Sequence, residues 1–156
     1  MAYAIMGVDV TNTGTTSEYL LGTRYLDDSA NEWLYVQAGV GGSTLNYAAF
    51  VDEAYSSVMI TTTNGTYGGL VGVPAVTIAA SSYGWVQVFG NTTVQAAATV
   101  SADVQLSTTA TDGVLDDATT GGVKAVGGIK LNTANTGVAG AASCFLNHPY
   151  VGATLA

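Results

Sequence analysis

The sequence predicts an all-β fold, a single-domain β barrel or sandwich with an extended N-terminal arm. Two observations carry this prediction. Segments rich in Val, Ile, Thr, Tyr and Trp recur about every ten residues, a spacing typical of β sandwiches and barrels, and turn residues separate them. The 156 residues fit one domain, and no linker is long enough to divide them. We therefore expect an arm over residues 1–24 and a β core over residues 25–156.

The first 24 residues differ from the rest of the chain, because they mix small apolar residues with Thr, Asn and Gly and show no sustained period. This pattern predicts an extended arm that pairs with another protein, or an ordered edge segment of the core. As an arm, it offers four apolar residues as contacts to a partner or a neighbouring subunit: Tyr3, Ile5, Met6 and Val8. Deletion of residues 1–20 is then expected to leave the core folded and to weaken attachment or oligomerisation.

Eight strands are expected after the arm: residues 32–38, 57–63, 70–79, 83–89, 92–100, 103–106, 123–131 and 138–146. The strongest turn signals between them are Asn64-Gly65 and Asp112-Gly113. Pro74 lacks a backbone donor, so its segment is expected to lie at an edge, to bulge or to form two shorter strands. Residues 48–55 could form two helical turns, but they lack a clean cap.

The most informative strand covers residues 83–90. One of its faces carries Tyr83, Trp85, Gln87 and Phe89. The other face carries Val86 and Val88, so both faces of the strand are apolar. A strand of this kind is expected in the middle of the fold, covered on both sides.

A second aromatic strand covers residues 32–38, where Trp33 and Tyr35 share a face. An exposed Trp–Tyr face could bind a sugar ring. Faces of this kind more often pack against a second sheet or a neighbouring subunit, which is the interpretation we favour. Trp33 and Tyr35 are therefore candidate interface residues.

Charged residues make up only 9% of the chain, against about 25% in a typical domain. The formal net charge is −8, and the only Lys and Arg residues are Arg24, Lys124 and Lys130. Phosphate backbones and anionic bilayers are bound by clusters of Lys and Arg, so we expect neither nucleic acid nor a membrane as a partner. The first residues lack the positive region and the apolar core of a signal peptide.

Residues able to carry out chemistry are scarce. Cys144 and His148 are the only cysteine and histidine; as a nucleophile and base they could form a small hydrolase, but no orienting third group is evident. One Cys and one His cannot complete a zinc site within one chain. The run Asp27-Asp28-Ser29-Ala30-Asn31-Glu32 could wrap a calcium ion, or it could be a turn whose side chains bond the backbone. We expect no catalytic residues, no cofactor and no metal.

A family resemblance covers most of the chain beyond the arm. It is carried by these motifs: Val71-Gly72-Val73, Val76-Thr77-Ile78-Ala79, the strand over residues 83–90, Val104-Gln105-Leu106, Asp112-Gly113-Val114-Leu115-Asp116-Asp117-Ala118 and Lys124-Ala125-Val126-Gly127-Gly128-Ile129. With them, the sequence resembles the capsid decoration proteins, or cement proteins, of tailed bacteriophages. It departs from that pattern at residues 100–103, where relatives commonly carry a glycine.

The resemblance implies a structural protein of the virion rather than an enzyme. Such a protein is made in the host cytoplasm, binds the major capsid protein on the outer surface of the head and bridges neighbouring capsomers. It implies a homo-oligomer, for which we favour a trimer over a dimer. The alternative is a tail or head-fibre module that binds host glycans through Trp33 and Tyr35.

Overall fold

The computed structural model describes residues 7–156, and every regular element within them is a β-strand. The strands are β1 (Arg24–Leu26), β2 (Glu32–Ala38), β3 (Ala49–Val51), β4 (Ser56–Met59), β5 (Leu70–Pro74), β6 (Tyr83–Ala96), β7 (Leu106–Thr108), β8 (Leu115–Asp116), β9 (Lys124–Leu131) and β10 (Gly140–Thr154). The predicted all-β, single-domain fold is thus confirmed. Over the same residues, no helix is long and apolar enough to cross a bilayer.

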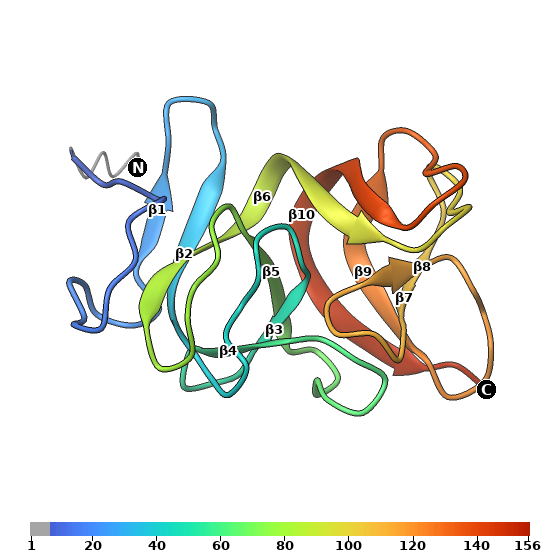
Figure 1. Ribbon diagram of the computed structural model, residues 1–156, viewed down its shortest axis with the longest axis horizontal. Helices are drawn as coiled ribbons and strands as arrows, with labels where there is room; N and C mark the ends of the chain where they lie inside the picture. The colour runs from blue at the N-terminus through green and yellow to red at the C-terminus, as the bar shows by residue number, and fades with distance from the viewer. Residues whose placement is uncertain (1–6) are drawn as a thin grey trace.

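The strands form one ten-stranded sheet that closes on itself twice (Figure 1). The first circuit runs β2–β4–β3–β5–β6 and back to β2, and the second runs β6–β8–β7–β9–β10 and back to β6. Neighbours are antiparallel except for the short parallel pairs β2–β4 and β6–β8. The result is two small barrels that share β6, with β10 joined to both because it also pairs with β5.

Each barrel has its own apolar filling. In the first barrel, alternate side chains of β2, β3 and β6 form a cluster that includes Leu34, Val36, Val51, Val86 and Val88. The larger cluster fills the second barrel with side chains of β6, β7, β8, β9 and β10, and it extends onto β3 and β5. Because alternate residues of a strand point to opposite faces, the residues between those of the first cluster face outward from that barrel.

The long strands β6 and β10 pair with each other over eight residues, from Gly140 opposite Ala96 to Asn147 opposite Phe89. Towards β9, strand β10 is irregular between Leu146 and Tyr150. This bulge changes the alternation of the strand: Asn147 and His148 are both exposed. The bulge therefore decides which side chains of β10 enter the core and which reach the surface.

Several predicted elements change in extent. The expected strands over residues 83–89 and 92–100 merge into a single strand, β6, which ends at Ala96, and of the expected strand over residues 103–106 only Leu106 is in a strand, as the first residue of β7. Residues 48–55 contain β3 and a turn instead of a helix. Strands β1, β3 and β8 have two or three residues each, too few to show a period in the sequence.

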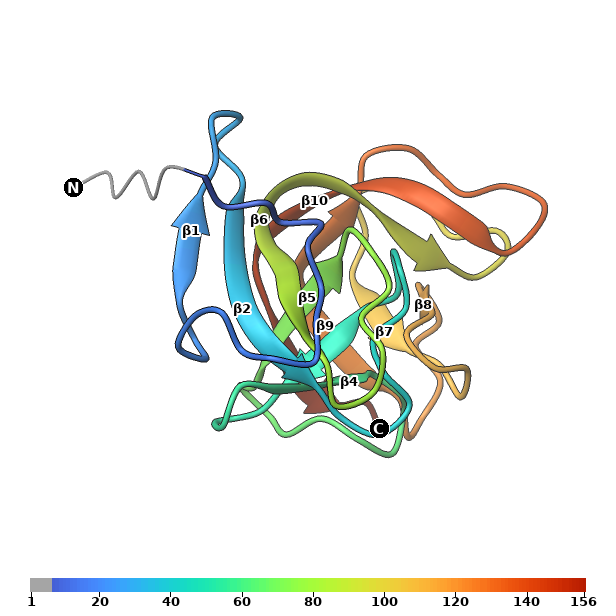
Figure 2. The ribbon, with the colours of Figure 1, turned by 60° about the vertical axis from the view of Figure 1, so that its left-hand side comes forward.

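The segment over residues 7–23 crosses the outer face of the first barrel, in front of β2 and β6 (Figure 2). It contains no strand, but Gly14 forms a bridge with Tyr83 at the start of β6. Four of its side chains, Val8, Val10, Tyr19 and Leu21, pack on the aromatic residues of that face. From residue 7 onward, the predicted arm is therefore packed on the core of its own chain.

Candidate functional site

The outer face of the first barrel is an aromatic cluster built from Trp33 and Tyr35 of β2 and Trp85 of β6. The ring centroids of Tyr35 and Trp85 lie 5.0 Å apart, and Tyr19 of the N-terminal segment packs 5.2 Å from Tyr35 and 5.3 Å from Trp85. Tilted and edge-on rings at these separations are favourable. Because β2 and β6 are paired neighbours, their outward residues form one continuous face.

Backbone groups fix the N-terminal segment to this face. The amides of Gly14 and Tyr83 each donate to the other's carbonyl, at 3.2 and 2.8 Å. The amide of Glu18 donates to the hydroxyl oxygen of Tyr35 at 3.1 Å, and the amide of Gly22 donates to the carbonyl of Tyr35 at 2.9 Å. Tyr35 is thus held on both its side chain and its backbone by residues that precede β1.

This face was expected to pack against a second sheet or a neighbouring subunit, or alternatively to bind a sugar ring, and in the structure a segment of the same chain covers it. Trp33 is 5% exposed and Tyr35 is 3% exposed, because the same chain covers them. In this conformation neither side chain is available to a sugar ring, a second sheet or a neighbouring subunit. Val8, a candidate contact residue, packs on this cluster. The other candidates, Tyr3, Ile5 and Met6, lie outside the described residues.

The run over residues 27–32 forms the turn between β1 and β2 and the first residue of β2, and Asp27 organises it. One oxygen of Asp27 accepts from the amides of Ser29 and Asn31, both at 2.9 Å. The other accepts from the side-chain amide of Asn31 at 3.0 Å and from the indole of Trp33 at 2.9 Å. Burial alone would raise the pKa of Asp27, but these donors together hold it below its ordinary value. Of the two interpretations of this run, the geometry matches the turn.

The same turn reaches the bend in β6. Gly90 has φ +105, and a Cβ there would lie 2.1 Å from the side-chain oxygen of Asn31. That oxygen accepts from the buried amide of Gln87 at 3.3 Å, and Gln87 also donates to the carbonyls of Phe89 and Asn91 at 3.0 and 3.1 Å. A glycine is required at the bend because any side chain would displace Asn31.

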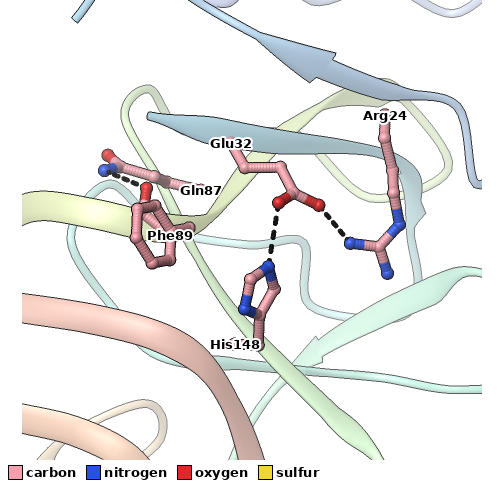
Figure 3. A network of polar contacts seen from close by, with 5 residues as sticks. All are labelled: Arg24, Glu32, Gln87, Phe89 and His148. Atoms are coloured by element: carbon pink, nitrogen blue, oxygen red, sulfur yellow. Dashed lines mark hydrogen bonds and ion pairs between the residues drawn. The ribbon is translucent and has the colours of Figure 1, made fainter. Parts of the chain in front are cut away.

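Beside this bend, Glu32 joins β1, β2 and β10 (Figure 3). Its carboxylate accepts from Arg24 on β1 and, at 2.8 Å, from Nε2 of His148 in the bulge of β10. The ring of His148 lies 5.4 Å from that of Phe89. Burial alone would raise the pKa of Glu32, but the hydrogen bonds and charges of His148 and Arg24 outweigh it and lower the pKa from its ordinary value.

Replacement of Glu32 by Gln is expected to reduce the free energy of unfolding at neutral pH by no more than about 1 kcal/mol. The folded protein holds the pKa of Glu32 below 4.5, so the stabilisation is present above that pH and is lost as pH falls through the lowered pKa. Melting temperatures of the wild type and Glu32→Gln should converge as the pH falls through the lowered pKa of Glu32. Asp28→Asn is the control, since Asp28 is an exposed carboxylate in the same turn. If the difference in melting temperature between the wild type and Glu32→Gln did not change with pH, this role of Glu32 would be contradicted.

The structure separates Cys144 from His148. The side chain of Cys144 is 0% exposed and belongs to the core of the second barrel, where burial raises the pKa of its thiol to about 12. The imidazole of His148 lies on the surface and pairs with Glu32. The bulge reverses the alternation of β10 between Cys144 and His148, so one side chain lies in the core and the other on the surface. They do not form a nucleophile–base pair.

A surface pocket of about 420 Å³ lies between the β3–β4 turn and the loop before β5. Its lining consists of Val51, Asp52, Glu53, Tyr55, Tyr67, Gly68, Gly69 and Leu70. Sequence reasoning did not identify it, since the two segments meet only through the pairing of β3 with β5. Over residues 7–156, no three Cys, His, Asp or Glu side chains are grouped closely enough to hold a metal ion.

Comparison of the sequence with models of known protein families finds no match, and comparison with curated proteins finds none either.

Proposed function

We propose that this protein is a structural component of a bacteriophage virion that binds the outer surface of the capsid and bridges neighbouring capsomers. Its partner is the major capsid protein, and it acts on the capsid surface as a homo-oligomer, with a trimer favoured over a dimer. The proposal is supported by the resemblance of residues 71–151 to capsid decoration proteins. It is also supported by features of the fold that suit docking to another protein.

The observation that carries the proposal is the open edge of β1. Among the strands formed by residues 7–156, every other strand has at least two strand neighbours, whereas β1 pairs only with β2. The amide of Asp27 donates towards β2, so by alternation the backbone groups of Leu26 and Arg24 face away from the sheet. An extended segment of another protein can add a strand at such an edge through backbone hydrogen bonds.

The residues around this edge favour contact with a partner protein over exposure to water. Leu20 is 85% exposed just before β1, and Leu26 is 47% exposed at its end. Nearby, the side chain of Arg24 is paired with Glu32 within the chain. A partner that covers this region buries apolar surface and desolvates few free charges. With many copies on one particle, modest contacts of this kind add up to firm attachment.

The test is co-sedimentation of the purified protein with capsids that lack it, compared between two matched variants. Leu26→Lys places a charge at the open edge, and Val138→Lys places the same charge on another exposed apolar residue, in the loop before β10. Leu26→Lys is expected to weaken attachment about tenfold, equivalent to about 1.4 kcal/mol, and Val138→Lys is expected to leave it unchanged. Failure of the wild type to sediment with any capsid would overturn the proposed function. Equal loss in both variants would overturn the role of β1.

A further inference from the structure

The pocket between the β3–β4 turn and the loop before β5 has a fixed framework. Val51 and Leu70, which end β3 and begin β5, pair with each other and bring the two loops together. One oxygen of Asp52 accepts from the amides of Ala54 and Ser56, both at 2.9 Å, and this fixes the course of the turn. The ring of Tyr55 packs over Gly22, where a Cβ would lie 2.4 Å from it.

The side chains around this pocket combine aromatic surface with negative charge. Among the aromatic residues of the described chain, only Tyr67 and Tyr150 are exposed, and Tyr67 is the more exposed of the two, at 76%. Asp52 and Glu53 contribute two carboxylates, and Glu53 is exposed. The pocket lining includes no Lys, Arg or His.

The cations of the chain are all engaged elsewhere. The protein has three Lys and Arg residues. Arg24 pairs with Glu32, and Lys130 pairs with Asp103 at 2.6 Å. Lys124 donates to the carbonyls of residues 64 and 65 at 2.7 and 2.9 Å. Within residues 7–156, the carboxylates of the pocket therefore form no ion pair with a Lys, Arg or His side chain, and the net charge of −8 adds to the negative potential around them.

From this combination we propose that the pocket receives a lysine or arginine side chain of a partner protein. The cationic head lies against the ring of Tyr67, whose face attracts cations, and within reach of the carboxylates of Asp52 and Glu53. The methylene groups of the ligand cover Leu70 and the ring of Tyr55. The identity of the partner rests on the proposed function, whereas the binding of the cation does not. The pocket is a second contact, on β3–β5, separate from the open edge of β1.

The experiment is a titration of the isotope-labelled full chain with N-acetyl-lysine methylamide and with its arginine analogue, followed by backbone amide shifts in NMR. Saturable changes of chemical shift are expected at the amides of Gly68, Gly69 and Tyr55. Because salt screens the attraction between the cation and the carboxylates, binding should be weaker at higher salt. Methyl glucoside, a neutral probe, should leave these amides unchanged. The relative response to the two cations identifies which side chain the pocket prefers.

Variants test which groups bind the cation. Tyr67→Ala and Glu53→Gln should each raise the dissociation constant for the cation about threefold. Asp28→Asn removes an exposed carboxylate from a different loop and should change nothing. Absent shifts, equal shifts with the glucoside, or an equal loss in Asp28→Asn would each overturn the inference. Binding of the lysine probe by a protein that fails to attach to capsids would contradict the proposed function and leave the cation site in place.

Discussion

A variant that lacks residues 1–20 is expected to unfold at a much lower temperature than the full chain and to aggregate. The deletion removes Val8, Val10 and Tyr19 from the aromatic cluster and exposes Tyr35 and Trp85. The lost burial corresponds to about 3–5 kcal/mol, a large fraction of the stability of a typical domain. The sequence left two interpretations of this segment open, an arm whose deletion leaves the core folded and an ordered edge segment of the core, and the packing of residues 7–23 favours the second.

The measurement is urea denaturation with a dye that binds exposed apolar surface, on three proteins. The full chain and a deletion that stops after residue 6 both keep Val8, Val10 and Tyr19, so they should unfold alike. The longer deletion should unfold at lower urea and bind the dye before it unfolds. If the longer deletion were as stable as the full chain, the segment would not be a part of the core. That result would support the hypothesis that the segment is an arm that binds a partner.

The central strands were predictable because their patterns are local. Strand β2 covers the expected residues 32–38, and residues 84–88 are buried on both faces of β6, as predicted, while Tyr83 and Phe89 are half-buried. In each case the period of two specifies both faces without reference to the rest of the chain. What covers the aromatic face could not be predicted, since the segment over residues 7–23 is irregular and contacts the core through scattered side chains.

Bends and bulges explain the remaining differences in the fold. Gly90 appears in the sequence as the end of a strand, whereas β6 continues through it with a positive φ. Pro149 signals an end at residue 146, whereas β10 passes it by means of the bulge at His148. Glycine and proline mark a change of direction in the two strands. The pairing with β10 shows that β6 continues past Gly90, and the pairing with β9 shows that β10 continues past Pro149.

The candidate sites were harder to predict than the fold because they join distant residues. Glu32 and His148 are 116 positions apart and meet only because the bulge of β10 lies beside the β1–β2 turn. The pocket requires two turns that β3 and β5 bring together. The low number of Lys and Arg residues, by contrast, was visible in the sequence, and it supports the proposed cation site.

Replacement of Trp85 by Ala is expected to lower the free energy of unfolding by about 3–5 kcal/mol. Trp85 is 1% exposed and contacts the rings of Tyr19, Tyr25 and Tyr35, so its removal leaves a cavity between β6 and the N-terminal segment. Urea denaturation followed by circular dichroism measures the change. Val138→Ala is the control, because a side chain that is 77% exposed should change stability by less than about 0.5 kcal/mol.

Combining Trp85→Ala with the deletion of residues 1–20 tests whether the segment and the cluster form one unit. Each change alone removes contacts between Tyr19 and Trp85, so the double variant should lose less stability than the two single losses together. The shortfall is the energy of the shared contacts, expected at about 1 kcal/mol or more. If the two losses in stability were strictly additive, the N-terminal segment would not contact Trp85 in solution. The aromatic face would then be open to a partner.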